Sequence, residues 1–164
     1  EPIVHPMVDK QTGTWQYIVA CPNTSQAVII DPVLNLDLAE LEISTISAKV
    51  VALASSNKYT SPIFWEPRAH ANHLTASSYI QKNILASKQP KAPIGTGQRI
   101  RLVQETFAPK YNIPKNESEY AFGYLFDDNE KFTIGDITAQ VLHLPGHTPD
   151  HSGYLIGSNV FTGG

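Results

Sequence analysis

The chain has 164 residues, of which 41 % are hydrophobic and 16 % charged, and its formal net charge is −3. This length and composition predict a single globular domain over residues 1–164 that can bury a substantial core. The weak net charge gives no broad basic surface, and no apolar run approaches the roughly 20 residues needed to cross a bilayer. We therefore expect neither a nucleic-acid partner nor a membrane partner.

The N-terminal residues lack the basic start and the apolar core of a signal peptide. The single cysteine, Cys21, cannot form an intramolecular disulfide, which fits a reducing compartment. A cytoplasmic or mitochondrial location is therefore favoured over secretion, although the sequence leaves the compartment open. Cys21 has no histidine or basic residue nearby in sequence to lower its pKa, so we expect an inert thiol.

The first half of the chain begins with strand patterns. Thr14–Ala20 and Gln26–Asp31 are β-branched and aromatic runs separated by the turn residues "CPNTS", which predicts a hairpin. Ser47–Tyr59 is rich in alanine and has apolar residues at helical spacing, which predicts a helix. The segment "SPIFWEP" after it is predicted to be a short buried strand, and it leads directly into a cluster of histidines.

The second half moves from helices back to strands. Helical spacing of apolar residues predicts helices over Thr75–Ser87 and Ile100–Tyr111, and the loop between them has room for a short strand at Ala92–Ile94. Four strand-like runs bounded by Gly, Pro or Asp follow: "KFTIG", "DITAQVLHL", "GYLIG" and "NVFTG". Strands, then helices, then strands again predict an α/β layer sandwich.

Four of the six histidines lie in two loops that each follow a predicted strand: His70 and His73 in "RAHANH", and His147 and His151 in "PGHTPDH". In an extended loop, residues two apart face the same way, so an H-x-H-x-D-H pattern presents imidazoles and a carboxylate to adjacent metal positions. A lone loop histidine is more commonly a surface residue, so the prediction of a metal loop depends on the two clusters together.

Two further histidines, His5 and His143, have no neighbours of ligand type and are expected to be ordinary residues. The equal spacing of His143, His147 and His151 does not indicate a helix, because Pro145, Gly146 and Pro149 interrupt it.

The chain resembles the metallo-β-lactamase superfamily, and within it the persulfide dioxygenase and glyoxalase II neighbourhood. Segments in the family's order carry the likeness over nearly the whole chain: "AVIIDPV", "AHANHLTASSYIQ", "FTIGD", "LPGHTPDHSGYLIG" and "VFTGG". The resemblance implies an αββα sandwich, incomplete at its C-terminus because relatives continue with further strands and helices. It also leads us to expect pairing with a second chain, such as a homo-oligomer, to cover the apolar sheet surface.

The metal motif departs from the family's pattern. Such proteins generally show T-H-x-H-x-D-H, whereas Arg68 here stands in the place of the first histidine and Asn72 in the place of the aspartate. Gly164 occupies the place of the metal-binding aspartate of the family's F-T-G-D. The metal ligands that the resemblance leaves are His70, His73 and His147, and the residues it implies as supports of the loops are Asp31, Asp150 and His151.

Three readings stay open. In the first, the fold no longer catalyses and serves as a binding or interaction module, with the Arg68 guanidinium in the vacant metal position and Asp150 or Asp31 as its counter-charge. In the second, one zinc ion on His70, His73 and His147 supports weak hydrolysis of thioesters, lactones or β-lactams. In the third, the sequence is a part of a protein whose function lies outside it.

Iron chemistry is the least supported expectation. The resemblance places the dioxygenase ligands at Arg68, His147 and Gly164, so His147 alone of the three is a ligand type. Zinc is therefore expected before iron, and no metal at all if the site is degenerate. By family, the substrate would be a small molecule.

Overall fold

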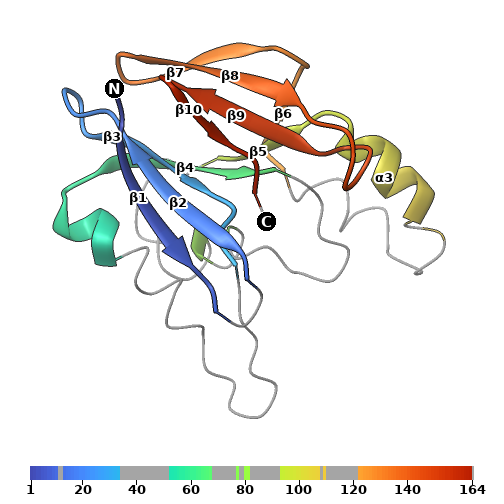
Figure 1. Cartoon of the computed structure of the whole chain (residues 1–164), viewed down its shortest axis with the longest axis horizontal. Coiled ribbons are helices and arrows are strands. Elements are labelled where there is room, and N and C mark those ends of the chain that lie inside the picture. Colours follow the sequence, from blue (N-terminus) through green and yellow to red (C-terminus); the bar gives the residue numbers. More distant parts are fainter. Residues whose placement is uncertain are drawn as a thin grey trace.

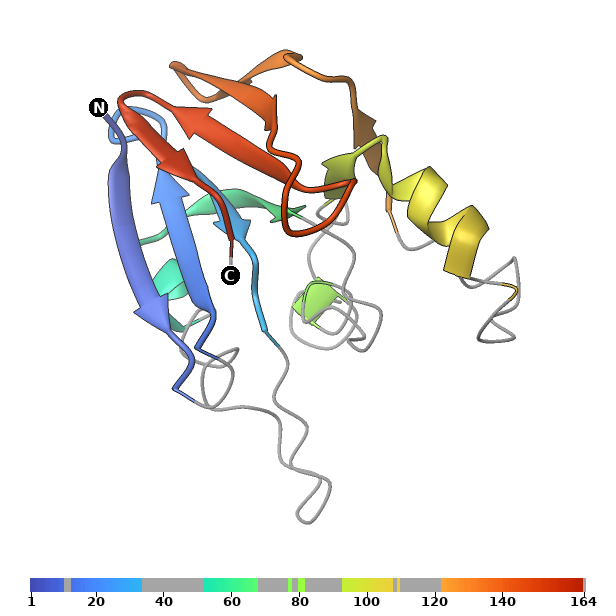
Figure 2. The same ribbon diagram turned by 45° about the vertical axis from the view of Figure 1, so that its right-hand side comes forward.

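The computed structural model describes residues 1–10, 13–33, 52–67, 77, 80–81, 93–107, 109 and 122–163. Two β-sheets lie face to face and form most of this part of the molecule (Figures 1 and 2). No helix in the described part is both long and apolar enough to cross a membrane.

The first sheet, within the described ranges, has six strands in the order β1-β2-β3-β4-β5-β6. Its strands are β1 (Ile3–Val8), β2 (Trp15–Ala20), β3 (Gln26–Ile30), β4 (Thr60–Glu66), β5 (Ile94–Gly97) and β6 (Tyr124–Phe126). The pairs from β1 to β3 are antiparallel, whereas those from β3 to β6 are parallel. The C-terminal ends of β3, β4, β5 and β6 therefore meet at one edge of the sheet.

The second sheet, as far as the described residues go, has four antiparallel strands in the order β10-β9-β8-β7. Its strands are β7 (Lys131–Ile134), β8 (Ile137–His143), β9 (Ser152–Ile156) and β10 (Asn159–Phe161). The helix α3 (Ile100–Phe107) follows β5.

The main hydrophobic core lies between the two sheets. It combines Val19, Val28, Ile30 and Trp65 of the first sheet with Val141, Tyr154, Ile156 and Phe161 of the second. The buried Trp65 ring stacks on Tyr154 at 5.0 Å between centroids and meets Phe132 edge-on at 4.4 Å. Such aromatic packing fixes the two sheets relative to each other.

A second core covers the opposite face of the first sheet. Ile18, Ile29 and Phe64 point to this side and pack with Ile80, and Leu53 of the helical residues 52–56 contacts the same cluster. Strands β3 and β4 are therefore buried on both faces, which explains why their sequences are almost continuously hydrophobic.

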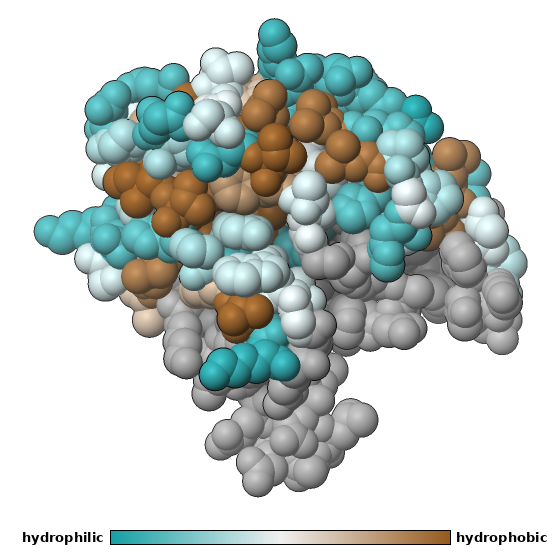
Figure 3. All heavy atoms as spheres, in the orientation of Figure 1, coloured by the Kyte–Doolittle hydropathy of each residue, from teal (hydrophilic) through white to brown (hydrophobic). Residues whose placement is uncertain are grey.

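Some large hydrophobic residues remain exposed. The described examples are Ile3, Val8, Trp15, Leu102, Tyr124 and Val160. On the face drawn in Figure 3, hydrophobic residues form separate groups among hydrophilic ones.

Most of the predicted elements that fall on described residues are confirmed. The hairpin of β2 and β3, the buried strand β4, the helix α3 and the four final strands occur as expected. The short strand is at Ile94–Gly97 instead of Ala92–Ile94, because parallel pairing with β4 and β6 extends the glycine-containing "IGTG". The predicted helix over 75–87 lies mostly outside the described residues, as do residues 47–51 of the first predicted helix.

Candidate functional site

The candidate site lies at the edge where the parallel strands end, which is where open α/β sheets commonly bind ligands. Asp31 follows β3, Glu66 ends β4, and the loop after each of these strands starts there. Ile30 pairs with Trp65, so Asp31 and Glu66 are the next residues on two adjacent strands. Both side chains are buried.

Asp31 connects the first sheet to the end of the described chain. Its backbone is in the left-handed region with φ 53°, and its N–H donates to the Trp65 carbonyl at 2.9 Å. A Cβ on Gly163 would lie 3.0 Å from Asp31 Oδ2 and 2.9 Å from Pro67 Cγ. Gly163 itself has φ +74°, so glycine here allows both the backbone conformation and the close approach.

Glu66 is a buried ionisable residue of the site that the sequence pattern did not predict. Burial and the neighbouring Asp31 carboxylate raise the pKa of Glu66 to about 8, against a hydrogen bond from Ser77 Oγ that lowers it. The Glu66 carbonyl accepts hydrogen bonds from Thr96 Oγ1 at 2.9 Å and from Tyr154 Oη at 3.0 Å. The signal in the sequence was a lone carboxyl at the end of the apolar run "IFWE".

The loop 144–151 after β8 is held by its own hydrogen bonds. The Thr148 carbonyl accepts from His151 N at 3.3 Å, and the Pro149 carbonyl accepts from His143 Nε2 at 3.0 Å. The Asp150 carbonyl accepts from Ser152 Oγ at 3.3 Å, and the His151 carbonyl accepts from Leu144 N at 2.9 Å. Four successive carbonyls are thus satisfied, which gives the loop one defined shape.

The same loop is bonded to the other two segments of the site. Ser152 N donates to the Pro67 carbonyl at 2.7 Å, directly before residue 68, and His151 Nε2 lies 2.5 Å from the Thr162 carbonyl, directly before Gly163. His147 is exposed, and its ring lies 6.2 Å from the His151 ring at an angle of 83°.

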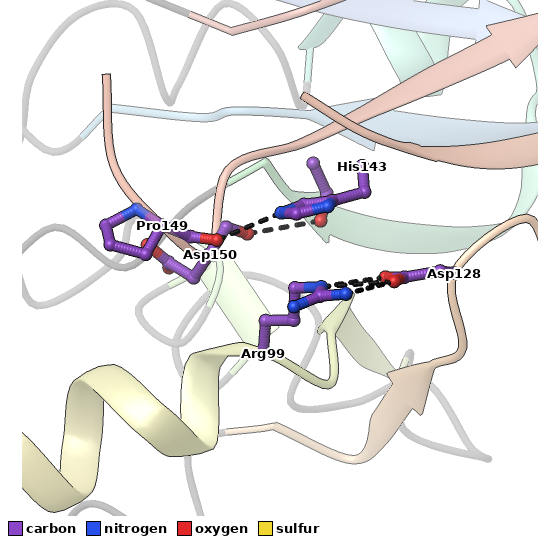
Figure 4. A network of polar contacts seen from close by, with 6 residues as sticks. Arg99, Asp128, His143, Pro149 and Asp150 are labelled. Atoms are coloured by element: carbon purple, nitrogen blue, oxygen red, sulfur yellow. Dashed lines mark hydrogen bonds and ion pairs between the residues drawn. The ribbon is translucent and has the colours of Figure 1, made fainter. Parts of the chain in front are cut away.

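An ion pair lies beside this loop. Figure 4 shows Arg99, which precedes α3, facing Asp128 near the His143 ring, while His143 points toward Pro149. Arg99 Nη2 is 2.6 Å from Asp128 Oδ2, and this guanidinium lowers the pKa of Asp128. The expectation that His143 is an ordinary residue is therefore incomplete, because its ring holds the loop.

The structure describes four of the predicted site residues, and five others lie outside the described ranges. Asp31, His147, Asp150 and His151 all lie at the same edge, and Asp150 and His151 are buried. The residues outside the described ranges are Arg68, His70, Asn72, His73 and Gly164. Among the described residues, no three His, Cys, Asp or Glu side chains are placed to hold a metal ion.

The ligand positions that the resemblance assigns to Arg68, Asn72 and Gly164 lie outside the described residues, so their side chains stay sequence-based expectations. His151, expected to support the loop, contacts the Thr162 carbonyl through Nε2. A guanidinium cannot coordinate a metal because it stays protonated and offers no lone pair.

Cys21 lies in the turn between β2 and β3, at the opposite end of β3 from Asp31. It is buried, and the Thr24 hydroxyl, followed by the backbone N–H of Asp136, lowers its pKa to about 7. The sequence prediction of an unactivated thiol overlooked these uncharged donors, because Asp136 is distant in sequence.

No family model matches the chain. Over 98 % of its length it is 34 % identical to a protein named glyoxylase B2 from Dictyostelium discoideum, of which the match covers 54 %. It is also 31 % identical to a β-lactamase hydrolase-like protein from Xylella fastidiosa, over 98 % of this chain and 36 % of that protein. The chain thus spans about half or less of these relatives.

The fold is that of a metallo-β-lactamase. The solved structure of a metallo-β-lactamase from Staphylococcus aureus matches 98 % of this chain and 41 % of its own with a TM-score of 0.68 at 21 % identity. Together with the relatives, this likeness confirms the predicted sandwich and its family. The chain belongs to the metallo-β-lactamase superfamily.

Proposed function

We propose that this chain is a metallo-β-lactamase-fold relative of the hydrolases whose metal-dependent catalysis is impaired, and that it acts as a binding module for a small molecule. The observation that carries the proposal is that the loops of the site are held in place while the side chains at the family's metal-ligand positions are poor ligands. The loops of the site are tied together by hydrogen bonds from Ser152 and His151, yet Arg68, Asn72 and Gly164 stand at ligand positions.

The charge of Arg68 supports the impairment. Two unit charges 4 Å apart interact by about 4 kcal/mol at an effective dielectric of 20, so a divalent ion at that distance would meet roughly twice this opposition. Asn72 offers an uncharged carbonyl oxygen and cannot act as a base, and Gly164 offers no side chain. Arg68 in the metal's place, with Asp31 or Asp150 as counter-charge, would favour an anionic ligand.

The second candidate is a weakly active zinc hydrolase. His70, His73 and His147 retain three imidazoles, which is a sufficient ligand set for a catalytic zinc with water in the fourth position. The exposure of His147 on a hydrogen-bonded loop favours this candidate, because such a side chain is accessible to an ion. Thioesters, lactones and β-lactams are the substrate classes to test.

Pairing with a second chain also stays a prediction.

Metal analysis and activity assays on untagged protein separate the two candidates. The proposal predicts substoichiometric zinc and iron, and no chelator-sensitive turnover of a thioester, a lactone or nitrocefin. One equivalent of zinc together with turnover that a chelator abolishes would establish the zinc hydrolase instead.

A restored ligand set provides the positive control. The triple variant Arg68→His, Asn72→Asp, Gly164→Asp is expected to bind zinc and to gain thermal stability from it, because binding to the folded state alone stabilises by mass action. The matched control, Arg68→Gln, Asn72→Asp, Gly164→Asn, removes the guanidinium without supplying the first histidine or the last aspartate. Equal zinc binding by both variants would contradict the assignment of the ligand positions.

A further inference from the structure

His151 links the loop 144–151 to a second segment of the site. Its backbone N–H donates to Thr148 O at 3.3 Å and its carbonyl accepts from Leu144 N at 2.9 Å, so the backbone belongs to the loop. Its side chain points out of the loop, and Nε2 lies 2.5 Å from the Thr162 carbonyl. The residue is only 9 % exposed, so this contact is largely shielded from water.

The segment that His151 contacts is itself fixed against the first sheet. Gly163 follows Thr162 and approaches Asp31 and Pro67 so closely that a Cβ on it would meet both side chains. One imidazole thus joins the "PGHTPDH" loop to the segment that leads to position 164.

His151 is also the aromatic neighbour of His147. The two rings lie 6.2 Å apart and nearly perpendicular, at 83°. His147 is exposed, so a packed ring beside it restricts the rotamers that it can adopt. The orientation of the His147 nitrogens therefore depends on where the His151 ring is held.

We propose that His151 is a positioning residue, which fixes His147 and the Thr162–Gly163 segment in one arrangement before any ligand binds. Because a carbonyl oxygen only accepts, Nε2 of His151 carries a hydrogen and donates it to the Thr162 carbonyl. The inference rests on the proposed function for the location of the site. Its test uses metal-free protein, so failure of the ligand proposal would leave the result on His151 unaffected.

Two substitutions separate the donor from the ring. His151→Phe keeps an aromatic ring beside His147 but removes the Nε2–H donor, whereas His151→Gln keeps a donor at a similar reach without the ring. Backbone ¹⁵N relaxation of Thr162 and Gly163 reports the link, and the Hα–Hβ couplings of His147 report its rotamer distribution.

The wild type and His151→Gln are expected to show order parameters near 0.85 at Thr162 and Gly163, whereas those of His151→Phe fall below about 0.6. The His147 couplings of His151→Phe should move toward rotamer-averaged values, because the ring is no longer anchored. Unchanged order parameters in a folded His151→Phe variant, or failure of His151→Gln to restore them, would overturn the proposal.

His143→Phe is the matched control, because it removes the other imidazole-to-carbonyl contact of the same loop, at Pro149. It is expected to leave Thr162 and Gly163 ordered, and an equal loss of order would mean that any loosening of the loop has this effect. If His151→Phe does not fold, the wild-type imidazole spectrum decides instead. A slowly exchanging Nε2–H supports the proposal, and an Nδ1–H tautomer of His151 contradicts it.

Discussion

Ser77 donates a hydrogen bond to the buried carboxyl of Glu66, and these two residues flank the histidine segment 67–76. The Glu66 carbonyl is held at the same time by Thr96 and Tyr154, one from each sheet. The loop that carries the metal motif in sequence therefore starts and ends at fixed points.

Glu66→Gln is expected to make stability less dependent on pH. A folded-state pKa raised from 4.5 to about 8 means that the wild type keeps the full contribution of neutral Glu66 below pH 4.5 and loses it as pH rises toward 8. Each pKa unit corresponds to about 1.4 kcal/mol, so the loss amounts to a few kcal/mol. Urea unfolding of both proteins at pH 5, 7 and 9 checks this. A constant difference between them across this range would contradict a buried neutral carboxyl.

Gly97→Ala is expected to destabilise the protein by about 1–3 kcal/mol, as overpacking typically does. An added Cβ would overlap Ser152 Oγ, the side chain that caps the Asp150 carbonyl. Gly146→Ala is the control, because its Cβ would meet nothing within 4 Å. Thermal unfolding measures both, and Ser152→Ala should partly relieve the Gly97→Ala defect. Equal effects at the two glycines would show that the close approach is not the cause.

Trp65→Ala is expected to cost about 3–5 kcal/mol, the range for a large buried aromatic side chain. Trp65 is 1 % exposed between the two sheets, whereas Trp15 is 48 % exposed at the surface. Trp15→Phe should therefore leave stability nearly unchanged and retain a blue-shifted emission from Trp65. Red-shifted emission of folded Trp15→Phe would be incompatible with a dry core around Trp65.

Asp128→Asn is expected to lower stability slightly at low salt and less at high salt, because the Arg99–Asp128 pair is partly exposed and screened. Arg99 lowers the pKa of Asp128, so this contribution is present above its ordinary pKa of 3.8 and lost as pH falls through the lower folded value. Melting temperatures in low and high salt test the effect, with Asp127→Asn as the neighbouring control. An effect that salt does not weaken would point to packing instead.

Thr24→Val is expected to raise the pKa of the Cys21 thiol from about 7 toward its ordinary value, because the hydroxyl is the main group that stabilises the thiolate. Cys21 is the only cysteine, so the pH profile of alkylation by iodoacetamide reports it alone. The reaction should be slow in both proteins because the thiol is buried. A profile that does not move would assign the lowered pKa to the backbone N–H of Asp136.

The amino-acid sequence is sufficient to predict the strands with strong periodicity and the family. The apolar runs of β2, β3 and β4 must be buried wherever they pair, and the "PGHTPDH" and "IIDPV" segments carry the resemblance without any coordinates. The identity of Arg68, Asn72 and Gly164 is likewise sequence information, and it carries the proposal of impaired catalysis.

Features that depend on contacts between distant segments could not be predicted from the sequence. The local sequence predicts a short strand near Ile94, but the extent of β5 over Ile94–Gly97 depends on parallel pairing with β4 on one side and β6 on the other. The pKa of Glu66 depends on Asp31 from the neighbouring strand, and the role of His151 depends on Thr162 from β10's end. Strand pairing and desolvation depend on which groups are close in space, and these groups become neighbours only when the chain is folded.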